Sequence, residues 1–128
     1  MSLAADQDRA AIEAAIHTYL DGLFEGDADK LAQVFHPTSA LTQWFEGELK
    51  ITPRDQWLDA VRTRPSAQAR GLARHDRILT IDLISDSMAH VKVQCALPPR
   101  FFVDILSFLK IDGRWQVAQK VYSTEMRE

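Results

Sequence analysis

Asp104 is the residue whose setting most clearly indicates chemistry, because it lies inside the apolar segment Phe101–Ile111. An ionised carboxylate is costly to bury among apolar neighbours. The side chain must therefore face water, be paired with a donor, or carry a proton at neutral pH. A neutral acid in an apolar pocket can donate a hydrogen bond to a bound molecule. The segment thus predicts a pocket around Asp104 without identifying its ligand.

Tyr19 and His36 are the other two candidate catalytic residues. Tyr19 lies on the apolar face of a predicted helix, where it either packs in the core or presents its hydroxyl to the pocket. In a purely structural alternative, Asp104 accepts a hydrogen bond from Tyr19 or Trp44 and stabilises the fold.

Histidines in general titrate near neutral pH, which suits a general base at position 36. A histidine followed by Pro37 also suits a turn at a helix end, and this interpretation is favoured.

Aromatic side chains along the chain could form the walls of a cavity for a flat, apolar ligand. These candidates are Phe24, Phe35, Trp44, Trp57, Phe102 and Phe108. The same rings could instead fill a core without a cavity, and we expect both uses in a chain of 128 residues. The predicted ligand is therefore a small apolar or aromatic molecule.

Several other kinds of site lack the residues that they need. The four histidines show no i, i+4 pair, and Cys95 is the only cysteine, which argues against a metal site and excludes an internal disulfide. There is no Gly-rich phosphate loop and no Gly-x-Ser-x-Gly elbow for a serine nucleophile. We therefore predict no metal and no cofactor, and we expect Cys95 to pack rather than react.

The composition narrows the classes of partner. The net charge of −3 gives no basic excess to neutralise phosphates, so nucleic acid is not an expected partner. No apolar run approaches the ~20 residues that span a bilayer, so no membrane contact is expected. Residues 1–5 do not resemble a signal peptide and are predicted to be a disordered leader or a remnant of cloning. Residues 6–128 are predicted to form one cytoplasmic domain.

The first half of the chain has helical periodicity. Apolar residues of 6–25 recur at steps of three and four, and Gly26 suits a left-handed helix end. Asp27 is predicted to cap a second helix, which ends before Pro37. A short strand at 40–45 and a return at 49–51 follow. Thr52 is then predicted to cap a third helix with its hydroxyl.

The second half changes to strand periodicity. The segments 78–84, 89–97, 101–111 and 115–122 are predicted strands, separated by turn residues. Sequential hairpins pair antiparallel. Helices followed by a meander predict an α+β fold, with the helices packed on one face of a curved sheet.

The strand at 101–111 is apolar on both faces. Phe102, Asp104, Leu106 and Phe108 share one face, and Ile105 lies on the other. One face is expected to meet the helices, and few elements remain to cover the second. We therefore predict a homodimer through the sheet, with an open surface as the alternative.

Five short stretches, in this order and spacing, resemble the nuclear transport factor 2-like superfamily over nearly the whole chain. They are Tyr19-Leu20-Asp21-Gly22, Glu25-Gly26-Asp27, Val34-Phe35-His36-Pro37, Phe102-Val103-Asp104 and Lys110-Ile111-Asp112-Gly113-Arg114-Trp115. The local match is to the SnoaL-like and putative lumazine-binding branches. The resemblance implies a conical barrel, in which a curved, mainly antiparallel sheet wraps around N-terminal helices as in cystatin-like folds. It also implies a deep pocket between those helices and the concave sheet face, and frequent dimers.

A more distant resemblance, to ketosteroid isomerases, implies roles for two residues. Those enzymes hold a substrate oxyanion between a tyrosine and a protonated aspartic acid, and Tyr19 and Asp104 occupy the matching positions. The position of the general base is taken by Gln43, which cannot accept a proton at neutral pH. Isomerisation by that mechanism is therefore not expected, although Gln43 could contact a ligand.

Three functions remain open at this stage. The first is a small-molecule-binding protein with an apolar pocket. The second is a SnoaL-like cyclase, isomerase or dehydratase that works without a cofactor. In this second case Tyr19 and Asp104 stabilise an enolate, and His36 or a bound water moves the proton. The third is a dimerisation or scaffold module.

Overall fold

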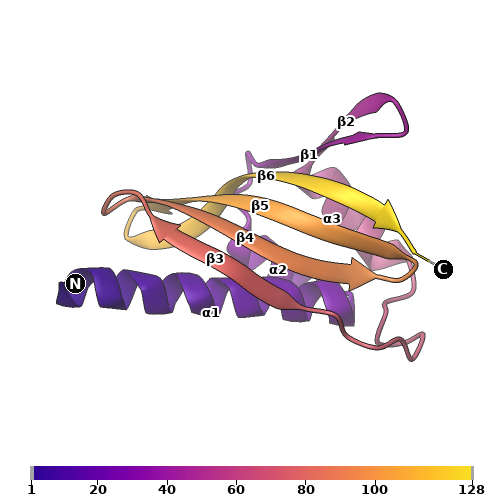
Figure 1. Ribbon diagram of the computed structural model, residues 1–128, viewed down its shortest axis with the longest axis horizontal. Helices are drawn as coiled ribbons and strands as arrows, with labels where there is room; N and C mark the ends of the chain where they lie inside the picture. Colours follow the sequence, from indigo (N-terminus) through magenta and orange to yellow (C-terminus); the bar gives the residue numbers. More distant parts are fainter. Residues whose placement is uncertain (1, 128) are drawn as a thin grey trace.

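The structure, a computed structural model, describes residues 2–127 and contains helices packed against one curved sheet (Figure 1). The helices are α1 (Leu3–Glu25), α2 (Ala28–Val34) and α3 (Arg54–Thr63). The strands are β1 (Ala40–Phe45), β2 (Glu48–Pro53), β3 (Arg77–Leu83), β4 (Met88–Leu97), β5 (Arg100–Ile111) and β6 (Arg114–Met126). No helix in this part of the chain has the length and apolar character needed to cross a membrane.

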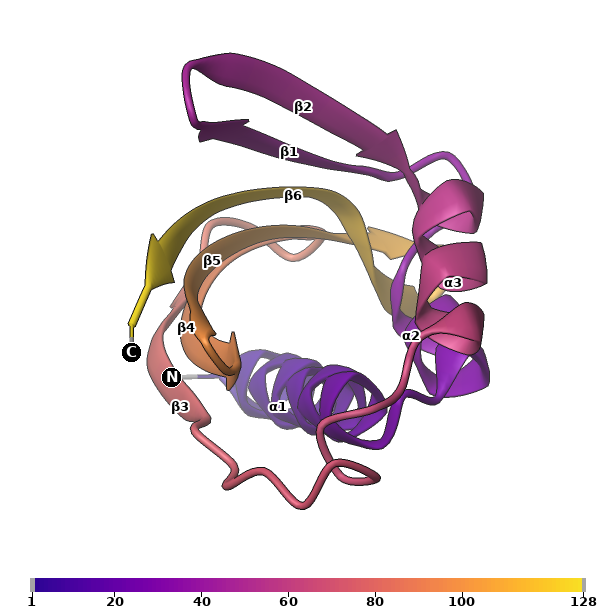
Figure 2. The same ribbon diagram turned by 90° about the vertical axis from the view of Figure 1, so that its right-hand side faces the viewer.

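The strands form a single sheet in the order β2-β1-β6-β5-β4-β3. Every neighbouring pair is antiparallel except β1 and β6, which run parallel. Figure 2 shows the sheet curling around α1, with α2 and α3 closing the side next to β1. The predicted α+β class and mainly antiparallel sheet are confirmed, and the sheet is open, with β2 and β3 at its edges.

Helix α1 is fixed at both ends by caps. The Ser2 hydroxyl accepts a hydrogen bond from the Ala5 N–H, so the helix begins three residues before the predicted range of 6–25. Gly26 ends it with φ 69°, a left-handed conformation that glycine adopts without penalty. The buried face of the helix includes Ile12, Ile16 and Tyr19.

The two shorter helices begin differently. Asp27 caps α2 as predicted, because its carboxylate accepts hydrogen bonds from the N–H groups of Asp29 and Lys30. The predicted Thr52 cap of α3 is wrong. Thr52 pairs with Leu41 in the β1–β2 ladder and remains extended, and the capping position falls on Pro53 without a side-chain hydrogen bond.

The core lies between α1 and the concave face of the sheet. On β5, Asp104, Leu106 and Phe108 are fully buried, whereas Ile105 is only half-buried. The side chains that share the face of Asp104 therefore point towards the helices, and Ile105 lies on the outer face. This arrangement brings the carboxylate of Asp104 next to α1.

Candidate functional site

Three polar side chains meet in the core, each from a different element. Tyr19 of α1 donates a hydrogen bond from its hydroxyl to Oδ2 of Asp104 on β5, at 2.5 Å. Lys120 of β6 donates from Nζ to the Tyr19 hydroxyl oxygen at 2.8 Å. Its Nζ lies 3.6 Å from Oδ2 of Asp104. These three residues, here called the buried triad, form an ion pair bridged by a phenol.

A bulge in β6 turns Lys120 inward. Phe108 pairs with Val117 and Ser107 pairs with Gln119, so Ala118 is an extra residue opposite β5. An extra residue shifts the alternation of side chains by one position. Val117 is buried before the bulge, and Lys120 is buried after it. Without the bulge, Lys120 would face outward.

Aromatic rings surround the amino group of Lys120. Its Nζ lies 4.5 Å from the centre of the Tyr122 ring, 5.3 Å from that of Tyr19 and 5.4 Å from that of Trp57. The electron-rich faces of such rings attract a cation. Together with Asp104 and the Tyr19 hydroxyl, they offset the cost of placing a charge where the side chain is only 6% exposed.

Burial also changes the ionisation of the neighbouring groups. The pKa of Tyr19 is well above its usual value, first because of burial and then because of the Asp104 charge. Burial likewise raises the pKa of Cys95, whose thiol donates to Oδ2 of Asp104 at 3.4 Å. Both groups are therefore neutral at physiological pH. Among the described residues, Oδ1 of Asp104 has no hydrogen-bond partner.

Lys120 reaches a cavity of about 210 Å³, here called the inner cavity, on the concave side of the sheet. Its apolar lining residues are Leu23, Leu41, Phe45, Trp57, Leu97 and Phe102. Its polar lining residues are Gln43, Lys50, Arg64, Arg100, Lys120, Tyr122 and Thr124. Pockets for drug-sized ligands have volumes of roughly 300–1,000 Å³, so this cavity suits a smaller ring compound.

The predicted site residues divide into those that line this cavity and those that do not. Gln43, Trp57 and Phe102 line it. Gln43 accepts a hydrogen bond from Thr124 at 2.8 Å. Tyr19 and Asp104 are brought together, but both are fully buried behind Lys120 rather than exposed to the cavity.

The remaining predicted residues lie elsewhere. Phe35 and Phe108 are fully buried in the core, and Trp44 is 70% exposed. Phe24 is half-buried outside the cavity, under the guanidinium of Arg74. His36 is part of a turn, where its Nδ1 lies 2.8 Å from the Thr38 hydroxyl.

Sequence reasoning did not identify Lys120, Tyr122, Arg64 or Arg100 as site residues. Strand alternation places Gln119 and Lys120 on opposite faces and leaves open which of them points inward, and nothing in the sequence marks the bulge at Ala118 that turns Lys120 towards the core. Arg64 caps the end of α3 and Arg100 begins β5 after Pro99, and a solvated surface is the usual interpretation of arginines at such element ends. Their approach to the cavity depends on how α3 and the β4–β5 hairpin pack.

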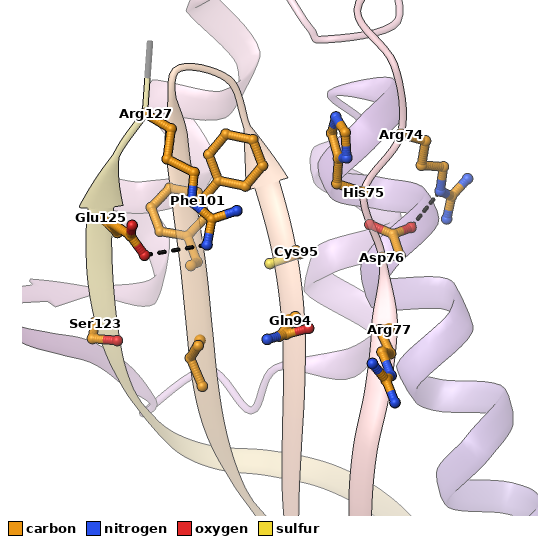
Figure 3. Close-up of a pocket in the computed structure, with 12 residues that line it drawn as sticks. Arg74, His75, Asp76, Arg77, Gln94, Cys95, Phe101, Ser123, Glu125 and Arg127 are labelled. Carbon is orange, nitrogen blue, oxygen red and sulfur yellow. Dashed lines mark hydrogen bonds and ion pairs between the residues drawn. The ribbon is translucent and has the colours of Figure 1, made fainter.

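A larger hollow of about 350 Å³, the outer groove, lies on the opposite face of the sheet. Figure 3 shows its side chains on β3–β6 and on the residues next to these strands, with Arg74 paired to Asp76 and Arg127 paired to Glu125. Phe101 packs between the ring of His75 and the guanidinium of Arg127. Because four of the five Asp, Glu and Arg side chains that line this groove are already paired, the inner cavity is the better candidate site.

Known proteins resemble this chain over most of its length. An aldolase, FrzH, of Cladobotryum sp. is 24% identical over 119 residues, which is 91% of each chain. The structure of an NTF2-like protein from Silicibacter pomeroyi DSS-3 superposes with a TM-score of 0.84 and 23% identity, covering 98% of this chain and 100% of that one. A structure named putative scytalone dehydratase, from Novosphingobium aromaticivorans DSM 12444, has a TM-score of 0.70 and 18% identity, covering 98% and 89%.

The sequence profile of one family covers nearly the whole chain. The match extends over residues 7–123, from the first turns of α1 to the last part of β6. It therefore includes all three residues of the buried triad. The fold is NTF2-like, as these neighbours show, and the chain belongs to the family described as "Putative lumazine-binding".

Proposed function

We propose that this protein binds a small ring compound in the inner cavity, and that Lys120 contacts a carbonyl or phenolate oxygen of that compound. The observation that carries the proposal is the buried amino group of Lys120 at the cavity wall. A lysine ammonium has three N–H donors. One donates to Tyr19 and another side of the group faces Asp104, so a donor remains available to a ligand.

Tyr19 and Asp104 act as positioning residues in this proposal. The single O–H of Tyr19 is already donated to Asp104, and neither residue lines the inner cavity. They hold Lys120 in place from behind. The family relationship supports a small-molecule ligand, and a cavity lined by both apolar and cationic side chains argues for a binding function rather than a scaffold module.

The second candidate function is an enzyme that stabilises an enolate. An ammonium in a water-poor site stabilises negative charge on a carbonyl oxygen, and aldol and dehydration reactions both develop such charge. The names of two relatives, an aldolase and a scytalone dehydratase, favour this candidate. Of the residues that the structure describes, no histidine, aspartate or glutamate lines the inner cavity, and Gln43 cannot accept a proton. The proton must then move through Lys120, Tyr122 or the substrate itself.

Binding of para-nitrophenol tests the role of Lys120. Its absorbance distinguishes the phenolate from the phenol, and the ammonium is expected to favour the phenolate when the compound is bound. Lys120→Met should weaken binding at least about tenfold, because a hydrogen bond to a charged group is lost. Titration followed by absorbance, with near-ultraviolet circular dichroism to verify folding, measures both effects.

Lys110→Met is the matched control, because Lys110 pairs with Asp8 outside the cavity. Its affinity for para-nitrophenol should equal that of the wild type. Equal affinity of a folded Lys120→Met variant would refute the proposal, as would the absence of binding by the wild type. For the enzyme candidate, the wild type should catalyse the exchange of deuterium for hydrogens on the carbon next to a ketone carbonyl. Lys120→Met should slow this exchange.

We also propose that the protein forms a homodimer through the outer face of the sheet. Ile105 on β5 and Val121 on β6 are paired neighbours on this face, and Val121 is 55% exposed. Adjacent apolar side chains on an exposed sheet face favour contact with a second surface. A second copy of the chain would cover them.

A further inference from the structure

Among residues 2–127, the charged side chains that line the inner cavity all have one sign, and the carboxylate of Asp104 lies behind Lys120. Lys50, Arg64, Arg100 and Lys120 line it, and no aspartate or glutamate is among its lining residues. The whole chain has a net charge of −3, so this local excess of positive charge is not a property of the composition. A site lined by one sign of charge attracts ligands of the opposite sign.

A smaller neighbouring cavity extends this positive region. It has a volume of about 30 Å³ and shares Leu23, Arg64, Leu97 and Arg100 with the inner cavity. It adds Arg70 to the cationic side chains, and no acidic residue in the described part of the chain lines it. The two cavities therefore adjoin at Arg64 and Arg100, and positive charge is concentrated at their junction.

Arg64 and Arg100 differ from two of the three arginines that line the outer groove, Arg74 and Arg127. Arg74 and Arg127 each pair with a carboxylate there. Within residues 2–127, no carboxylate lies in ion-pair distance of Arg64 or Arg100. The pKa of Arg64 is lowered, first by partial burial and then by repulsion from Arg100. An anion between these two guanidinium groups would relieve that repulsion.

We infer that the ligand of the inner cavity is an organic anion, whose carboxylate or phosphate group binds to Arg64 and Arg100. Guanidinium groups are well suited to bind such planar or tetrahedral oxyanions with two hydrogen bonds. The inference rests on the proposed function, in which the oxygen at the other end of the ligand contacts Lys120. It adds a charged group to the apolar or aromatic ligand that the sequence predicts.

Two matched compounds test the inference. Para-hydroxybenzoate and para-hydroxybenzamide carry the same phenol and differ only in the charged group. We expect the benzoate to bind about tenfold more tightly, and we expect Arg64→Met and Arg100→Met to remove this advantage. The affinity of the benzamide should stay the same in both variants. Isothermal titration calorimetry at two salt concentrations measures the difference, since salt weakens contacts between exposed charges.

Arg77→Met is the control, because Arg77 lies in the outer groove. It should leave both affinities unchanged. Equal affinities of the two compounds in the wild type, with no effect of Arg64→Met or Arg100→Met, would refute the anion while leaving the role of Lys120 intact. Binding of neither compound, together with no binding of para-nitrophenol, would refute the proposed function as well. A phosphorylated phenol of the same size then separates a phosphate preference from a carboxylate preference.

Discussion

At the scale of single residues, the buried triad is an unusual use of charge. Isolated buried charges are avoided, because each loses its hydration. Here Lys120 and Asp104 share the phenol of Tyr19 between them, and rings cover the ammonium. Breaking such a pair by removing one partner is costly, whereas removing both is much less so. The triad therefore couples the stability of the core to the position of the amino group that reaches the cavity.

This coupling predicts a non-additive pair of substitutions. Asp104→Asn should lower the free energy of unfolding by about 3 kcal/mol, because it leaves the Lys120 ammonium without its counter-charge. Adding Lys120→Met should restore part of that loss, since the uncompensated charge is then gone. Urea unfolding of the two single variants and the double variant measures the coupling. If the two single losses simply add, the residues do not interact energetically.

The sequence identified two of the three triad residues. Asp104 stands out as an acid in an apolar strand, and Tyr19 lies on the apolar face of α1, so their contact follows from the pattern. The possibility that Asp104 accepts a hydrogen bond from Tyr19 was one of the sequence-based alternatives. What the pattern did not predict is that both are covered by Lys120. That outcome depends on the side-chain direction of one lysine, which is decided by the bulge in β6.

At the scale of elements, the strands and helices themselves were largely predictable. Helical and strand periodicities are local properties, and the caps Gly26 and Asp27 end and begin helices where the sequence indicates. The exceptions are positions where a tertiary contact overrides a local signal. Thr52 is held in the β1–β2 ladder, and Ala118 forms a bulge opposite β5. Thr52 is held by its partner strand β1, and the bulge at Ala118 is set by the register with β5. Neither pairing register can be read from the local sequence.

The contact between α1 and the loop after α3 leads to a prediction about Gly26. A Cβ at Gly26 would lie 2.8 Å from Cβ of Ser66, in the loop that follows Arg64. Gly26→Ala should therefore combine the strain of a left-handed backbone, about 1 kcal/mol, with a steric conflict of about 1–3 kcal/mol. The expected loss in the free energy of unfolding is measured by urea titration.

Gly71 provides a closely matched control. Its φ is 68°, against 69° for Gly26, and a Cβ there would meet nothing within 4 Å. Gly71→Ala should therefore lose only the backbone contribution. Equal losses for Gly26→Ala and Gly71→Ala would mean that the loop moves aside freely, and Arg64 would then be held less firmly at the inner cavity than the proposed anion contact requires.

At the scale of the whole molecule, the two faces of the sheet have different roles. The concave face covers α1 and forms the inner cavity, while the outer face holds paired charges in the outer groove and apolar side chains beside it. A further apolar surface occurs on the β1–β2 hairpin, where Trp44, Leu49 and Ile51 are 60–70% exposed. Each surface is a candidate homodimer interface, and placing a charge on each tests the position of the interface.

The proposed homodimer predicts that Ile105→Lys gives monomers. The new ammonium would have to be desolvated at the centre of an apolar contact between β5 strands, whereas in the monomer it stays in water. Light scattering after size-exclusion chromatography, over a range of concentrations, measures the mass. Ile84→Lys is the control, because Ile84 is 53% exposed and follows β3 outside this face. If Ile51→Lys instead dissociates the dimer, the interface lies on the hairpin. A wild type that stays monomeric at every concentration would remove the need for a second copy, and the outer face would then be an open surface.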